Sequence, residues 1–155
     1  MHVLEREVVI PAPRDEVFAF FSDASRLKDI TPSWVGFEDV TEPGPMEAGA
    51  HVVHRIRWFR IPLKWTTVIE SFDRPNSFVD VQVKGPYRSW RHEHTFEERG
   101  EQTLMRDVVQ YELPFGILGS AAHRLVVARQ LKRIFDHRAR RIRRIFAKKA
   151  EATSA

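Results

Sequence analysis

The sequence contains no cysteine among its 155 residues. Disulfide bonds, thiolate catalysis and zinc sites built on cysteine are therefore excluded. The chain also lacks an apolar run approaching the roughly 20 residues that a membrane-spanning helix needs. Its first residues, MHVLEREVVIPAP, do not show the basic segment followed by an apolar segment that marks a signal peptide. We therefore expect a soluble protein of the cytoplasm.

Motifs for nucleophilic and phosphate chemistry are absent as well. The chain has no Gly-x-Ser-x-Gly sequence and no glycine-rich phosphate loop. It also shows no internal repeat, low-complexity linker or domain boundary. Its length is that of one domain. We expect a single domain over residues 1–150, followed by a disordered tail over 151–155.

Positive charge is concentrated near the C-terminus. The net charge is +4, yet the segment from His123 onward contains eleven Lys or Arg residues and only two acidic residues. A basic amphipathic helix can rest on an anionic membrane, so contact with lipid head groups is one interpretation, and a merely solvated helix face is the other. Nucleic-acid binding is not expected, because no aromatic stacking strip accompanies the charge.

Alternating apolar residues and turn residues predict an α+β protein. A first strand over 2–10 is followed by Pro11-Ala12-Pro13 and two short helices, the second over 24–29. Strands are then expected at 35–41, 51–59, 63–72, 78–84, 88–97 and 103–113. A long helix over 120–149 completes the chain, with inward positions at Leu125, Ala128, Leu131, Ile134 or Phe135, Ile142, Ile145 and Phe146. Short turns favour an antiparallel meander that the long helix covers.

Three segments resemble a known superfamily. They are VIPAP at 9–13 with VFAFFSD at 17–23, GPYRSWRHEHTF at 85–96, and YELPFGILG at 111–119. Together they are similar to the START-related SRPBCC superfamily, in the branch of polyketide cyclase/dehydrase and lipid transport. The resemblance implies the helix-grip fold, a curved antiparallel sheet of about seven strands around a long C-terminal helix. It also implies a cavity for a hydrophobic, lipid- or polyketide-like ligand, with no metal and no cofactor.

Strand periodicity predicts an unusually polar inner wall. Side chains two apart on a strand face the same way, which places His92 and His94 on one face with Trp90 and Phe96. The same reasoning applied to the other strands completes a set of ligand-binding candidates: His54, Trp58, Trp65, Trp90, His92, His94, Phe96, Asp107 and Tyr111. Because buried polar groups need partners, a lined cavity explains this wall better than a dry core does.

Several roles remain open for the polar members of this wall. His92 and His94 could pair with Asp107 and Tyr111 as satisfied interior groups, or they could orient a ligand. A His-x-His pair completed by His54 or Asp107 could also hold a metal, although none is expected. For catalysis, His92, His94, Asp107 and Tyr111 are the candidates for proton transfer on a bound carbonyl compound.

The favoured hypothesis for function is a binding protein, a carrier or sensor of a hydrophobic small molecule. The first alternative is an aromatase/cyclase-like or dehydratase-like enzyme that uses the inward His, Asp and Tyr residues. The second alternative is a regulator that contacts a membrane or a partner protein through its basic helix.

Overall fold

A computed structural model describes residues 1–39, 45–58, 60–114 and 120–153, without the side chains of 39, 58 and 120–124. Short helices follow the first strand, a run of strands comes next, and a long helix ends the chain. The strands are β1 (His2–Ile10), β2 (Glu38–Asp39), β3 (His51–Trp58), β4 (Ile61–Asp73), β5 (Ser77–Lys84), β6 (Ser89–Arg99) and β7 (Gln102–Glu112). The α-helices are α1 (Arg14–Phe21), α2 (Leu27–Ile30) and α3 (Ser120–Thr153), and the 3-10 turns are η1 (Ala24–Arg26) and η2 (Ser33–Val35).

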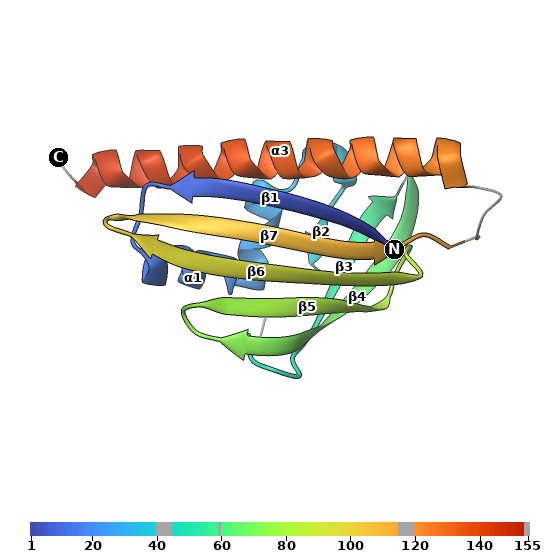
Figure 1. Ribbon diagram of the computed structural model, residues 1–155, viewed down its shortest axis with the longest axis horizontal. Coiled ribbons are helices and arrows are strands. Elements are labelled where there is room, and N and C mark those ends of the chain that lie inside the picture. Colours follow the sequence, from blue (N-terminus) through green and yellow to red (C-terminus); the bar gives the residue numbers. More distant parts are fainter. Residues whose placement is uncertain (40–44, 59, 115–119, 154–155) are drawn as a thin grey trace.

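The seven strands form one antiparallel sheet in the order β1-β7-β6-β5-β4-β3-β2. Figure 1 shows α3 running alongside the long strands, with the short helices behind the sheet in that view. This arrangement confirms the predicted helix-grip fold. One boundary differs clearly: within the expected strand 35–41 only Glu38–Asp39 is paired, while Val35 ends η2 and residues 40–41 lie outside the described ones.

Local sequence signals account for the short helices. Pro13 precedes α1 in an extended conformation, and Asp15 and Glu16 occupy its first turn, where the helix dipole favours acidic side chains. Asp23 caps η1 by accepting a hydrogen bond from the backbone N–H of Ser25. Phe18 of α1 is fully buried and packs α1 against the sheet.

The long helix differs from expectation at both ends. It continues to Thr153, so residues 151–153 are helical rather than a disordered tail. Leu125 and Ala128 are exposed, and Val127 takes the inward position instead. The first turns offer the run Leu125-Val126-Val127-Ala128, in which helical period alone does not single out one apolar face. Packing against the sheet selects the stripe through Val127, Leu131, Phe135, Arg138, Ile142 and Phe146. No helix within the described residues is long and apolar enough to cross a membrane.

Two apolar clusters fill the space under the sheet. The first joins α1 to one end of the sheet and of α3, with Phe18, Phe96 and Met105 among its members. The second lies towards the other end of α3, with Trp90, Tyr111 and Phe135 among its members. The strands β6 and β7 and the helix α3 each contribute residues to both clusters, so their middle positions lie between the two clusters.

Candidate functional site

A buried polar layer separates the two apolar clusters. On β6, His92 and His94 lie between Trp90, which belongs to one cluster, and Phe96, which belongs to the other. Both histidines are buried, at 5% and 3% exposure. On the neighbouring strand β7, Asp107 holds the corresponding middle position and pairs directly with His94 in the antiparallel register. The predicted facing of these residues is therefore correct.

Two further charged residues belong to this layer and were not among the candidates. Asp80 on β5 pairs with His92 across the strands, and its side chain is only 18% exposed. Arg138 reaches the layer from α3, between Phe135 of one cluster and Ile142 of the other. The layer thus contains two carboxylates, two imidazoles and one guanidinium drawn from three strands and a helix.

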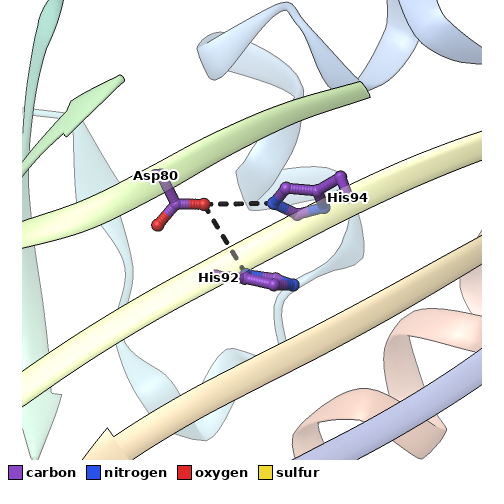
Figure 2. A group of neighbouring side chains, drawn as sticks. All are labelled: Asp80, His92 and His94. Atoms are coloured by element: carbon purple, nitrogen blue, oxygen red, sulfur yellow. Dashed lines mark hydrogen bonds and ion pairs between the residues drawn. The ribbon is translucent and has the colours of Figure 1, made fainter. Parts of the chain in front are cut away.

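The distances within the layer define one connected group. Nε2 of His92 lies 2.9 Å from Oδ1 of Asp107 in a hydrogen bond, and Nε2 of His94 lies 3.0 Å from Oδ2 of Asp80 in another. Nδ1 of His92 is 3.6 Å from the same Asp80 oxygen (Figure 2). Nδ1 of His94 approaches Oδ1 of Asp107 to 2.9 Å but makes no well-aligned hydrogen bond among the described residues. Nη2 of Arg138 is 4.0 Å from Asp107 Oδ1.

Both carboxyl groups are held in the ionised form. Burial by itself raises the pKa of Asp107, but the positive charge of Arg138, the hydrogen bond from His92 and the close contact with His94 outweigh it and hold the pKa well below its usual value. For Asp80, burial again raises the pKa, and the hydrogen bond from His94 leads the effects that bring it below the ordinary value. The layer therefore presents two negative charges.

The two histidines respond in opposite directions. Burial and the neighbouring charge of His94 lower the pKa of His92, despite its contacts with both carboxylates. Burial also lowers the pKa of His94, but its contacts with Asp107 and Asp80 prevail and leave that pKa raised. Two chemically identical side chains, two residues apart, thus favour different protonation states.

Of the two residues that the sequence analysis missed, only Arg138 gave a signal in the sequence. Arg138 stands on the apolar stripe of α3, three residues after Phe135 and four before Ile142, so helical spacing alone could have separated it from the solvated arginines. Asp80 gave no such signal. The valines at 79, 81 and 83 form the more apolar row of β5, yet Val83 is 58% exposed and Asp80 faces inward. Its place follows from pairing with His92, which local sequence does not reveal.

A cavity of about 210 Å³ adjoins the polar layer. It lies between the inner face of β3 to β6, the helix α3 and the short helices, and its walls are mostly apolar. Aromatic and aliphatic side chains such as Phe21, Phe37, Ile56, Ile69 and Leu131 line it, and Asp80, His92, His94 and Arg138 form one polar side. An apolar pocket with a few convergent polar groups is the usual form of a small-molecule site.

The predicted ligand-binding residues divide into three groups. His54, Trp65, Trp90, His92 and His94 line the cavity. Phe96, Asp107 and Tyr111 are buried in the layers next to it: Asp107 stands behind the histidines, and the other two belong to the apolar clusters. The side chain of Trp58 lies outside the described ones. His54 contacts the ring of Phe37 and does not belong to the group formed by Asp80, His92 and His94 among the described residues.

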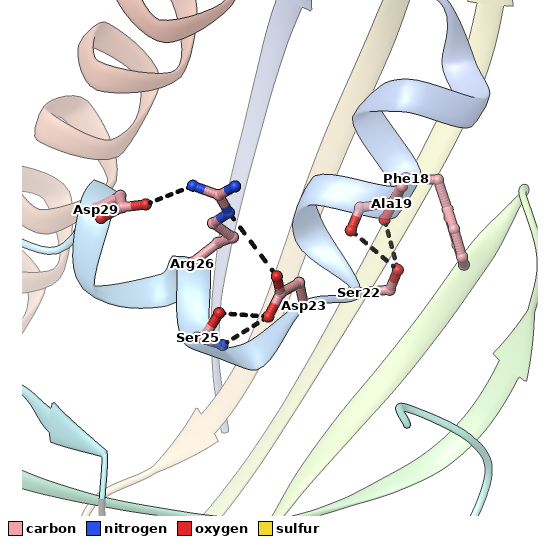
Figure 3. A network of polar contacts seen from close by, with 7 residues as sticks. All are labelled: Phe18, Ala19, Ser22, Asp23, Ser25, Arg26 and Asp29. Carbon is pink, nitrogen blue, oxygen red and sulfur yellow. Dashed lines mark hydrogen bonds and ion pairs between the residues drawn. The ribbon is translucent and has the colours of Figure 1, made fainter. Parts of the chain in front are cut away.

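The segment after α1 borders the same cavity. Figure 3 shows Asp23 holding this segment through contacts with Ser25 and Arg26. Arg26 also pairs with Asp29 at 3.5 Å, and α1 ends with the hydroxyl of Ser22 donating to the carbonyl of Phe18. Asp23 and Arg26 both line the cavity, so this exposed polar network forms its rim on the side of the short helices.

Comparison with known families places the chain. Residues 10–140 match the family described as polyketide cyclase / dehydrase and lipid transport. The chain belongs to this family, and its membership is consistent with binding of a hydrophobic ligand. None of the curated proteins compared with the chain matches it.

Solved structures share the fold. A START superfamily protein from Mycobacterium smegmatis is similar, with a TM-score of 0.70 and 11% identity over 96% of this chain and 99% of that one. A nucleoside-diphosphate sugar epimerase from Corynebacterium glutamicum gives 0.73 and 21% over 97% of this chain but only 30% of its own. The di-domain ARO/CYC BexL from the BE-7585A biosynthetic pathway gives 0.67 and 16% over 93% and 46%.

Proposed function

We propose that this protein binds a hydrophobic small molecule, lipid- or polyketide-like, in the cavity between the sheet and α3, as a carrier or sensor. The observation that carries the proposal is the cavity itself, whose lining is aromatic and aliphatic except for one polar side. Burying an apolar ligand there removes its surface from water, which favours binding by roughly 25 cal/mol for each Å² of apolar surface buried. Family membership is consistent with the same class of ligand.

The polar side indicates that the ligand carries a hydrogen-bond acceptor. Among the described residues, Nε1 of Trp65 and Nε of Arg138 are buried N–H donors with no hydrogen-bond partner, and both residues line the cavity. Buried donors are nearly always satisfied in native proteins, so a ligand oxygen or a bound water is expected beside each of them. A mainly apolar ligand with a carbonyl or hydroxyl group fits this distribution of donors.

Native mass spectrometry tests the proposal directly. The protein is purified without detergent and sprayed under native conditions, first as purified and then after incubation with medium-chain fatty acids, naphthols and flat polyphenols. A retained or added mass of one small molecule per chain is expected, together with a change in tryptophan fluorescence, because Trp65 and Trp90 line the cavity. Absence of any adduct, with unchanged fluorescence across all three ligand classes, would contradict it.

A second candidate function is proton transfer on a bound carbonyl compound, as in an aromatase/cyclase-like or dehydratase-like enzyme. The observation in its favour is the pair His92 and Asp107: the carboxylate orients an imidazole that faces the cavity. Incubation with the retained compound should then give a product of altered mass in the wild type but not in His92→Phe. If the compound leaves unchanged in both, the protein only binds it.

A further inference from the structure

We propose that Asp80, His92 and His94 form a binding site for a divalent transition-metal ion of the zinc type, open to the ligand cavity. One ligand atom from each side chain lies within 4.8 Å of the others. The donor set, two imidazole nitrogens and one carboxylate oxygen, suits Zn²⁺, Co²⁺ or Fe²⁺ rather than Ca²⁺ or Mg²⁺, which prefer oxygen alone. This site goes beyond the proposed binding of a hydrophobic molecule, because it uses the carboxylate and imidazole groups of the cavity wall rather than its apolar lining.

The spacing of the ligand atoms suits a single ion. Two atoms that each lie about 2.1 Å from a metal are about 3.0 Å apart in octahedral and about 3.4 Å apart in tetrahedral geometry. Oδ2 of Asp80 is 3.0 Å from Nε2 of His94 and 3.6 Å from Nδ1 of His92. Asp80 pairs directly with His92 on the adjacent strand, and His94 lies two residues further along that strand on the same face, so the sheet itself holds these distances (Figure 2).

Asp107 supplies the outer support that metal-binding histidines usually have. Its Oδ1 lies 2.9 Å from Nε2 of His92 and 2.9 Å from Nδ1 of His94, in each case the ring nitrogen turned away from Asp80. A carboxylate in that position favours a proton on the outer nitrogen and leaves the lone pair of the inner nitrogen for the metal. The hydrogen bond with Asp107 thus orients the imidazole of His92, and the same carboxylate lies in contact with the outer nitrogen of His94.

One tautomer of His92 places two hydrogen-bond acceptors side by side. When Nε2 of neutral His92 donates to Asp107, its Nδ1 has only a lone pair. That lone pair lies 3.6 Å from an oxygen of Asp80 that also has only lone pairs. Two acceptors this close gain from a positive charge between them, and a metal ion would bind both.

The position of the site connects it to the cavity. Asp80, His92 and His94 all line the cavity, so the coordination positions not filled by protein would face a bound molecule. The positive charges of a divalent ion and of Arg138 together exceed the negative charges of the Asp80 and Asp107 carboxylates by one, so this wall would carry one net positive charge. An anionic oxygen, from hydroxide or from a ligand, would balance it.

Metal titration of the untagged protein tests the inference. The protein is stripped with a chelator, dialysed, and titrated with Zn²⁺ by calorimetry and with Co²⁺ by visible absorption. We expect one ion per chain and a Co²⁺ spectrum of low-coordinate nitrogen and oxygen ligation. Asp80→Asn should weaken binding at least ~100-fold, and Asp107→Asn about 10–100-fold. His51→Gln, at an exposed histidine, should leave the affinity unchanged.

A measurement on the wild type guards against variants that fail to fold. Zn²⁺, which is diamagnetic, should shift the imidazole proton resonances of His92 and His94 strongly while leaving those of the exposed His51 unchanged. Lack of stoichiometric binding, equal affinity in Asp80→Asn, or shifts confined to other histidines would each overturn the metal site. None of these results would bear on hydrophobic ligand binding, because the native mass measurement follows a different molecule.

Discussion

Asp107 shows how a buried charge is supported in this protein. It is 4% exposed, and the side chains that it contacts, those of His92, His94 and Arg138, all belong to the polar layer. A buried ion pair is an uncertain source of net stability, because desolvation offsets the attraction. Removing one partner is a different matter, since the remaining charge stays buried without compensation.

Replacement of Arg138 should therefore destabilise the fold. Arg138→Met keeps the approximate length of the side chain but removes the positive charge beside Asp107. We expect the free energy of unfolding to fall by about 3 kcal/mol, measured by urea denaturation. Arg129→Met, an exposed position on the same helix, should change it by less than about 0.5 kcal/mol.

The double variant Asp107→Asn/Arg138→Met provides the check on cause. Neutralising both partners should recover part of the loss, because no unpaired charge then remains. Equal destabilisation by Arg138→Met and Arg129→Met, or strict additivity of Asp107→Asn and Arg138→Met, would show that the pair has no energetic role.

At the scale of elements, α3 has two distinct faces. The inward face carries Leu131, Phe135, Ile142 and Phe146, all buried against the sheet. The outward face is strongly basic and exposed, with Arg129, Lys132, Arg133, Arg140, Arg143, Arg144, Lys148 and Lys149. Figure 1 shows the helix at the edge of the molecule beside β1, which leaves that face accessible. Such a surface can attract an anionic membrane without inserting into it.

Vesicle pelleting tests the role of this basic face. We expect the protein to sediment with vesicles containing phosphatidylserine at low salt and to be released as salt rises. Arg140→Gln/Arg144→Gln should lower the partition coefficient roughly 30-fold, at about 1 kcal/mol for each charge near the surface. Lys64→Gln/Lys84→Gln on the exposed face of the sheet is the matched control and should bind normally. If the wild type stays in the supernatant at low salt, the face is only solvated.

At the scale of the whole molecule, the cavity is a consequence of how three layers close. The sheet, α3 and the short helices meet through two apolar clusters, and a cavity of about 210 Å³ remains beside the polar layer. Filling this space from Ile56 should separate ligand binding from folding, because Ile56 lines the cavity but belongs to neither cluster.

A pair of substitutions on β3 tests this separation. Ile56→Trp places a larger side chain in the cavity and should abolish binding of the retained small molecule while changing the free energy of unfolding by less than about 2 kcal/mol. Val53→Trp, on the neighbouring row of the same strand, should leave binding intact. Fluorescence titration and urea denaturation measure the two effects. Normal binding by a folded Ile56→Trp would place the ligand elsewhere.

Much of the fold was predictable from local patterns. The boundaries of β1 and β3 to β7 agree with the expected strands within about two residues, because alternation and turn residues act over short distances. The facing of His92, His94 and Asp107 was predictable for the same reason: side chains on a strand alternate strictly. The tail and the start of α3 were not, since helical propensity near a chain end or a boundary does not choose a packing face.

The helix-grip fold, the polar inner wall and the basic helix were all predictable from the amino-acid sequence. That Asp80 and Arg138 join His92, His94 and Asp107 in one layer emerged from the folded structure. Asp80 meets His92 through strand pairing, and Arg138 meets Asp107 through helix-on-sheet packing. Both are contacts between residues distant in the chain, and local periodicity holds no information about the partner that will stand opposite.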